Sequence, residues 1–138
     1  MILVDANVLI DIVVAESTWT AWSQGQLMAA SIEGLAINFV IYAEIAPCFA
    51  QKSELDLFLG DFAIRTLPIS DRAAYLASTA HQDYRAAGGQ RLATLPDFFI
   101  GAHAETSGLR LLTRDPKRIR TYFPKVELLC PPDAASLL

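Results

Sequence analysis

The sequence is poor in the residues that form disulfide frameworks and soft-metal sites. It contains only two cysteines and two histidines in 138 residues. Cys48 and Cys130 do not have the spacing of metal ligands, and we interpret them as small, buried, apolar side chains in a reducing cytosol. This scarcity argues against a secreted, disulfide-stabilised domain and against a cysteine-ligated metal site.

Long uninterrupted hydrophobic runs are also missing. The most apolar stretch, residues 34–50, contains Asn38, Glu44 and Pro47, so it does not match a membrane span of about 18 apolar residues. The N-terminus has no basic segment and reaches an acidic residue at Asp5, which argues against a signal peptide. We therefore expect a cytoplasmic protein without a membrane partner.

The chain lacks the excess of basic residues that marks many nucleic-acid-binding proteins. Its 11 basic and 15 acidic residues give a net charge of −4. The charge is uneven, however, because residues 85–125 carry a net charge of +5 and the remainder −9. We therefore expect a basic patch in the last third of the chain. The hydrophobic fraction of 53% leaves two interpretations open, a dense core or an apolar surface that pairs in an oligomer.

Short apolar runs alternate with helical patterns along the whole sequence. We predict strands at residues 1–5, 35–39, 63–69, 109–113 and 126–129. We predict helices at residues 6–14, 17–30, 40–50, 70–88, 94–108 and 116–123, and a further helix that opens at residue 53. Expected N-caps are Ser17 or Thr18, Ser53 and Ser70. The alternation predicts one domain over residues 1–138, a three-layer α/β/α fold around a mainly parallel sheet.

Three carboxylates stand out as isolated charges in apolar stretches, Asp5, Glu44 and Asp97, and Asp115 joins them as a fourth. Asp5 ends the first predicted strand and Asp115 follows the fourth, and ligands bind at the carboxyl ends of strands in such sheets. Acids gathered there would raise one another's pKa values, and a divalent cation would relieve the repulsion. Oxygen ligands without cysteine or a histidine cluster favour Mg²⁺ or Mn²⁺ and suit phosphodiester hydrolysis.

Three of these acids also fit ordinary helix capping. Asp5 precedes a predicted helix, Thr94 and Asp97 have capping-box spacing, and Asp115 precedes a proline that could open a helix. Capping therefore remains an alternative for each of them taken singly.

Glu44 is harder to explain by capping, because we place it inside a helix with apolar neighbours on all sides. Its structural alternative is a buried pair with an arginine. We interpret Asp11 as a solvated helix residue, and its part in a site stays open.

Four blocks of the sequence resemble the PIN domain of VapC-type toxins from bacterial toxin–antitoxin pairs. The blocks are "LVDANVLID", "YAEI", "LPDFFIGAHA" and "LLTRDPKRIRTYFP", and together they span residues 3–124. The resemblance implies that Asp5, Glu44, Asp97 and Asp115 are the catalytic acids that hold the metal. It also implies an Mg²⁺- or Mn²⁺-dependent endoribonuclease, a homodimer and a cognate antitoxin protein.

We also assign hypothetical roles to other polar residues, in orienting the metal ligands and in contacting RNA. The resemblance places Asn7 and Thr113 at polar positions of the motifs, from which they would orient the metal ligands. Candidates for contacts with RNA phosphates are Arg91, Arg114, Lys117 and Arg118, and a solvated basic face is the alternative for each of them.

Three alternative functions stay open. A PIN-like module could bind RNA or protein without cutting it. A phosphatase of the haloacid-dehalogenase kind would need a second acid where Asn7 stands. A receiver-like signalling module would need paired acids after the first strand, where Asp5 stands alone, and an acid after the strand at residues 63–69.

Overall fold

The fold is built on one parallel sheet. The computed structural model describes residues 1–89 and 95–132. Its strands are β1 (Ile2–Val4), β2 (Leu35–Asn38), β3 (Ile64–Leu67), β4 (Arg110–Leu112) and β5 (Leu128–Leu129). They lie in the order β3-β2-β1-β4-β5, and every neighbouring pair is parallel. The predicted mainly parallel sheet is therefore confirmed.

Strand burial follows position in the sheet. Every residue of β1 and β2 is buried, and β4 is buried except at its first residue. The edge strands β3 and β5 are only partly buried. Central strands covered on both faces need continuous apolar sequence, which is why "ILV" and "LAI" lack the alternation of a half-exposed strand.

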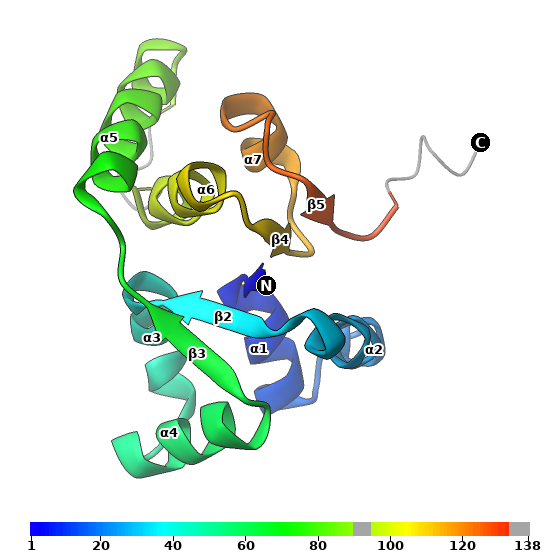
Figure 1. Ribbon diagram of the computed structural model, residues 1–138. Helices are drawn as coiled ribbons and strands as arrows, with labels where there is room; N and C mark the ends of the chain where they lie inside the picture. Colours follow the sequence, from blue (N-terminus) through cyan, green and yellow to red (C-terminus); the bar gives the residue numbers. More distant parts are fainter. Residues whose placement is uncertain (90–94, 133–138) are drawn as a thin grey trace.

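The helices form two layers around the sheet. One group is α1 (Ala6–Val14), α2 (Thr20–Ala30), α3 (Phe39–Ile45) and α4 (Lys52–Asp61), with 3₁₀ turns at Ser31–Glu33 and Ala46–Cys48. The other group is α5 (Asp71–Ala86), α6 (Leu95–Ser107) and α7 (Lys117–Tyr122). The chain steps from β1 to β3 in one direction and then returns through β4 to β5, so right-handed crossovers put the two groups on opposite faces. In Figure 1, α5, α6 and α7 lie together on one side, and α1, α3 and α4 lie on the other.

Helix α6 packs closely against the chain that follows α7. A Cβ atom at Gly101 would lie 2.3 Å from the ring of Phe123, so only glycine allows this approach. The Phe123 ring is buried and makes an edge contact with Phe98, with ring centroids 6.0 Å apart. This packing holds α6 and α7, which carry Asp97 and Arg118, in a fixed relation.

The predicted helix starts are right in two cases, Asp5 before α1 and Ser70 before α5, and wrong in three, while the predicted cap Thr94 lies outside the described residues. Ser70 caps α5 and accepts a hydrogen bond from the Ala73 amide at 3.0 Å. The cap of α2 is Trp19. The Ser17 hydroxyl accepts from the Trp19 amide, which lies before the first turn of the helix. The residue before α7 is Pro116, so Asp115 does not cap it.

Helix α4 is the third case. It begins at Lys52 with Gln51 as its cap, and Ser53 is inside it. Asp56, at capping-box spacing from Ser53, accepts from Lys52 Nζ at 2.6 Å and from the Tyr42 hydroxyl at 2.7 Å, and not from a backbone amide at the start of the helix.

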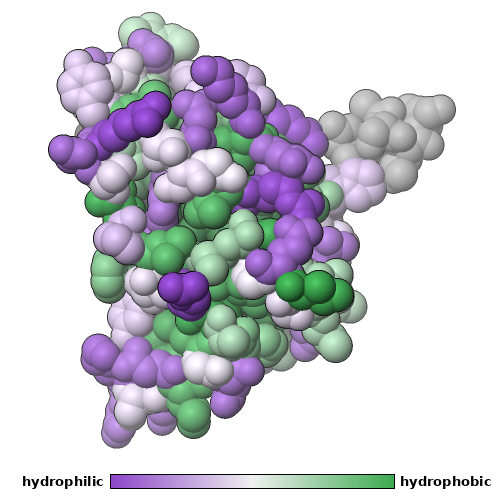
Figure 2. Space-filling model, in the orientation of Figure 1, coloured by the Kyte–Doolittle hydropathy of each residue, from purple (hydrophilic) through white to green (hydrophobic). Residues whose placement is uncertain are grey.

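The surface keeps a number of large apolar side chains. The most exposed of them are Met28, Ile32, Phe39, Leu57 and Tyr75. Figure 2 shows apolar residues running through the middle of one face, between more hydrophilic regions. Both cysteines are half-buried, so they are less enclosed than we expected. Among the described residues, no helix combines the length and apolarity that crossing a membrane requires.

Candidate active site

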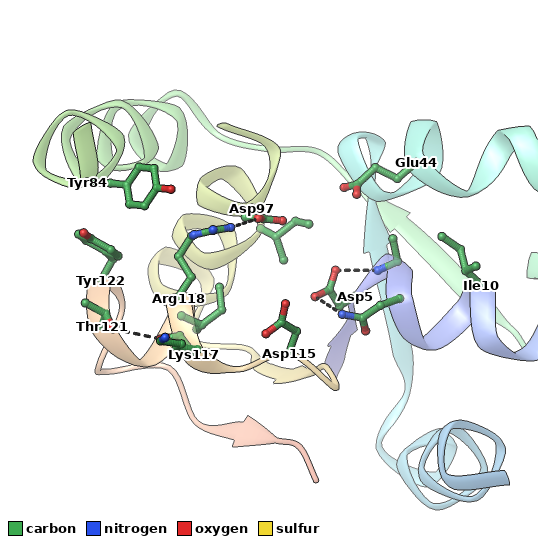
Figure 3. Close-up of a pocket in the computed structure, with 14 residues that line it drawn as sticks. Asp5, Ile10, Glu44, Tyr84, Asp97, Asp115, Lys117, Arg118, Thr121 and Tyr122 are labelled. Atoms are coloured by element: carbon green, nitrogen blue, oxygen red, sulfur yellow. Dashed lines mark hydrogen bonds and ion pairs between the residues drawn. The ribbon is translucent and has the colours of Figure 1, made fainter. Parts of the chain in front are cut away.

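A pocket of about 610 Å³ opens at the carboxyl edge of the sheet. Four acids line it, and each comes from a different segment: Asp5 follows β1, Glu44 is on α3, Asp97 is on α6 and Asp115 follows β4. Figure 3 shows the four carboxylates along this pocket, with Asp5 and Glu44 toward one end. The structure thus brings together the four acids that the sequence singled out.

Asp5 is held firmly by its neighbours. It caps α1, and its Oδ1 accepts from the Ala6 amide at 2.7 Å. Its Oδ2 accepts from the Thr113 hydroxyl at 2.8 Å and from Asn7 Nδ2 at 3.3 Å. Burial raises the pKa of Asp5 to about 6, against the hydrogen bond from Thr113, and the charges of Asp97 and Asp115 act in the same direction as burial.

Asn7 and Thr113 connect the ends of β1 and β4. Besides its bond to Asp5, Asn7 Nδ2 donates to Thr113 Oγ1 at 3.3 Å, and Asn7 Oδ1 accepts from the Arg114 amide at 3.3 Å. The Asp115 amide donates to Thr113 Oγ1 at 3.1 Å. Both side chains therefore fix the backbone that carries Asp5 and Asp115.

Glu44 lies on the rim of the pocket. It is exposed, which corrects the expectation of apolar neighbours on all sides, because α3 turns Ile41 and Ile45 toward the core and Glu44 away from it. Its pKa is nevertheless raised to about 7, by desolvation first and then by the charges of Asp5 and Asp97. Among the described residues no arginine pairs with it, so its structural alternative is not met.

Asp97 has a different neighbour, the guanidinium of Arg118, with which it forms an ion pair. Burial raises the pKa of Asp97, and Asp115 adds to the rise, while Arg118 opposes it. Figure 3 shows Arg118 reaching from α7 across the pocket to this carboxylate. One of the four acids therefore already has a positively charged partner within the protein.

The carboxylate oxygens of the pocket suit a hard divalent cation. Their positions, however, allow only a few of them to bind the same ion. Asp5 and Glu44 are carboxylates whose pKa values rise partly through their neighbours' negative charge. Within residues 1–89 and 95–132, no three acidic, histidine or cysteine side chains converge closely enough to hold one ion. Mg²⁺ needs only one or two carboxylates when it keeps several waters, so this arrangement is compatible with it.

The four basic candidates have different surroundings. Lys117 and Arg118 line the pocket. Arg114 does not line it and pairs with Asp11 through Nε at 2.8 Å. Arg91 lies outside the described residues.

Asp11 is not the solvated residue that we expected. It is 2% exposed, and its Oδ2 accepts from Arg114 Nε and from Ser23 Oγ, each at 2.8 Å. The partners come from the turn after β4 and from α2, so no local pattern in the sequence could identify them. Asp11 joins three segments and holds the turn that carries Asp115.

Sequence analysis also missed the aromatic wall of the pocket. Tyr84 on α5 and Tyr122 on α7 line it, together with Thr121. No spacing relates these residues along the chain, and only the packing of α5 and α7 beside α6 brings them together.

Comparison with known proteins gives one family match. The model of the PIN domain matches residues 2–124, which is most of the chain. No curated protein sequence matches it.

Similar solved structures agree on the fold. VapBC2 from Rickettsia felis, bound to a promoter DNA fragment, gives a TM-score of 0.72 at 18% identity and covers 96% of this chain and 100% of its own. FitAcB from Neisseria gonorrhoeae gives 0.67 at 21% identity, covering 94% and 96%. A toxin–antitoxin complex from Klebsiella pneumoniae gives 0.62 at 24% identity, covering 86% and 89%.

Proposed function

The chain belongs to the PIN domain family, and we propose that it is a metal-dependent endoribonuclease, the toxin of a toxin–antitoxin pair that acts in the cytoplasm. The observation that carries the proposal is the gathering of Asp5, Glu44, Asp97 and Asp115 around one pocket. Four acids from four segments are a costly arrangement unless their charge serves a cation. In this proposal, residues 1–138 form one domain.

The acids divide the work in this proposal. Asp5, Asp97 and Asp115 would hold Mg²⁺ or Mn²⁺, directly or through water, and Glu44 would complete the cluster. The bound cation would supply an activated water and offset the charge on the phosphate oxygens. Asn7 and Thr113 keep Asp5 oriented through the hydrogen bonds described above.

The basic residues would position the RNA. Lys117 and Arg118 stand at the pocket, where they can contact phosphates beside the acids. Arg114 is engaged with Asp11, so we assign it to the support of the site and not to RNA contact. Arg91 remains a candidate for a phosphate contact.

A direct test is incubation with a mixed RNA pool and Mg²⁺ or Mn²⁺, followed by mapping of the cut ends. We compare the wild type with Asp115→Asn, because Asp115 is exposed and its replacement should not disturb folding. The matched control is Asp71→Asn, an exposed acid at the start of α5 that does not line the pocket. Cleavage should require the metal, survive in the control and disappear in Asp115→Asn. Equal cleavage in EDTA, or in Asp115→Asn, would remove the proposal.

A non-catalytic PIN-like module is the second candidate. The ion pair between Arg118 and Asp97 favours it, because one acid already has a cation of the protein as its partner. Under this alternative the protein binds the RNA pool, and the RNA stays uncut in the presence of Mg²⁺ or Mn²⁺.

Two protein partners belong to the proposal. The similar structure from Klebsiella pneumoniae is a toxin–antitoxin complex, which supports a cognate antitoxin here. The exposed apolar side chains support a homodimer. A short reading frame directly upstream, whose product restores growth and co-purifies with this chain, would identify the antitoxin, and light scattering gives the oligomeric state.

A further inference from the structure

The pocket has a second end that the four acids do not explain. Tyr84 and Tyr122 line it, with their ring centroids 5.9 Å apart and their planes at 80°. Figure 3 shows both tyrosines at the end away from Asp5 and Glu44. Phosphodiester chemistry at the acids does not require aromatic rings there.

The two rings are held in place from behind. Both contact Phe98, which is fully buried, at centroid distances of 5.5 Å for Tyr84 and 5.4 Å for Tyr122. A Cβ atom at Gly89 would lie 2.3 Å from Tyr84 Cε1, so the chain leaves room for this ring by having no side chain there. Rings fixed in this way lose little freedom when a ligand stacks on them.

Cations separate the tyrosines from the acids. The guanidinium carbon of Arg118 lies 5.2 Å from the centroid of the Tyr84 ring, and the same group pairs with Asp97. Lys117 lines the pocket as well. Along the pocket, the order is therefore aromatic rings, positive charge and carboxylates.

We propose that the tyrosine end is a subsite for an unpaired RNA base, placed beside the phosphate that the acids would act on. This order repeats the order of a nucleotide, with a base that stacks on aromatic faces and a phosphate that meets cations. The cavity of about 610 Å³ lies in the range of small-ligand sites. The inference rests on the proposed function and adds a position, at Tyr84 and Tyr122, for the base next to the phosphate.

The alternative is that the tyrosines only complete the core around Phe98. Phe98 and Phe123 are buried, whereas Tyr84 and Tyr122 are only partly buried and face the pocket. Core packing explains how the rings are held but not why they line the pocket beside a guanidinium.

The test measures binding of fluorescent RNA by anisotropy in EDTA, so that cleavage does not interfere. The probes are a short single-stranded RNA of mixed sequence, the same strand in a duplex, and an oligomer of equal length with abasic riboses. The variants are Tyr84→Leu, which removes the stacking face, and Tyr84→Phe, which keeps it. Tyr75→Leu is the matched control, since Tyr75 is on the same helix, 78% exposed and away from the pocket.

Wild type should bind the single strand about tenfold more tightly than the abasic oligomer or the duplex. Tyr84→Leu should bind the single strand about tenfold more weakly than wild type, with no change for the other probes. Tyr84→Phe and Tyr75→Leu should bind the single strand as wild type does. Unchanged binding of the abasic oligomer, with an intact melting transition, shows that the variant is folded. Should Tyr84→Leu fail to fold, Tyr122→Leu takes its place, with the same expected loss for the single strand and Tyr122→Phe as its conservative control.

The outcomes separate this inference from the proposed function. Equal binding of base-containing and abasic strands, in a protein that cuts the pool with metal, overturns the base subsite alone. Preference for the duplex also overturns it. Absence of any RNA binding or cleavage overturns both proposals.

Discussion

Asp5 and Asp11 stand at the start and in the middle of the same helix, α1, with opposite surroundings. Asp11 is buried and meets a cation, Arg114, together with the hydroxyl of Ser23. Asp5 is partly buried and receives only neutral donors, while its neighbours across the pocket are other acids. The same type of side chain is thus compensated at one position and left charged and uncompensated at the other.

The contrast separates a structural acid from a functional one. A buried carboxylate that exists for stability is provided with a positive partner and hydrogen bonds. A carboxylate that awaits a ligand keeps unfavourable neighbours, which raise its pKa. Substitutions at the two aspartates and at Arg114 should therefore have opposite effects on activity and on stability.

The largest effect should come from Asp5→Asn. We expect the proposed RNA cleavage to fall by at least about a hundredfold, because a neutral amide cannot hold or orient the cation. The free energy of unfolding at neutral pH should stay the same or rise, because the change removes a charge that burial disfavours. Cleavage rates and urea denaturation measure the two effects. Loss of stability together with activity would place Asp5 with Asp11 as a structural acid.

The second effect should be the loss of stability in Arg114→Met. This change leaves the Asp11 carboxylate buried without its cation, and breaking buried pairs in this way costs about 3–5 kcal/mol. Arg114 is itself 32% exposed, so the wild-type pair is not fully desolvated and we expect the lower half of that range. Arg72→Met serves as the control for loss of an exposed arginine, at the start of α5 and outside the Asp11 cluster. A change below about 1 kcal/mol would show that Asp11 needs no cation.

The sequence predicts the sheet and its acidic edge well, for a physical reason. Continuous apolar strands and the acids after them are local features, and parallel connections bring strand ends to one edge. Asp5 and Asp115 could therefore be placed from the sequence alone.

The partners of the acids could not be predicted. Arg114 meets Asp11 across most of the chain length, and Arg118 meets Asp97 only because α7 packs beside α6. The predicted cap of α2 was wrong for a local reason, since the Ser17 hydroxyl accepts from the Trp19 amide before the helix begins. The pattern of a sequence gives the elements, whereas long-range pairing decides which acids are compensated.

The third effect should be a smaller loss of stability in Asp11→Asn. The amide keeps an oxygen for Ser23 or Arg114, and the guanidinium left behind can turn toward solvent. We therefore expect a loss of about 1–3 kcal/mol in the free energy of unfolding, less than for Arg114→Met. The proposed cleavage should fall only in proportion to unfolded protein. The order of the two variants in urea denaturation is the measurement, and the reverse order would contradict the asymmetry.

The smallest effect concerns the pH dependence of stability in EDTA. The pKa of Asp5 is about 6 in the folded protein against 3.8 ordinarily, so between these values the folded state binds more protons than the unfolded chain. Its contribution therefore makes the protein more stable as the pH falls from about 7 to about 4. Glu44, with a pKa of about 7 against 4.5, acts in the same direction. Burial lowers the pKa of His103, which has the opposite effect, but this effect is common to wild type and variant.

The comparison of wild type with Asp5→Asn isolates the contribution of Asp5. At about pH 7.5 the variant should melt at the same temperature as wild type or higher, because wild type then carries the disfavoured charge. As the pH is lowered to about 5, Asp5 becomes protonated in the folded state. The melting temperature of wild type should then rise relative to that of the variant. Melting temperatures by calorimetry across this range give the difference. If the melting temperature of wild type instead fell relative to that of the variant on acidification, Asp5 would be a compensated acid. The division between the two aspartates would then fail.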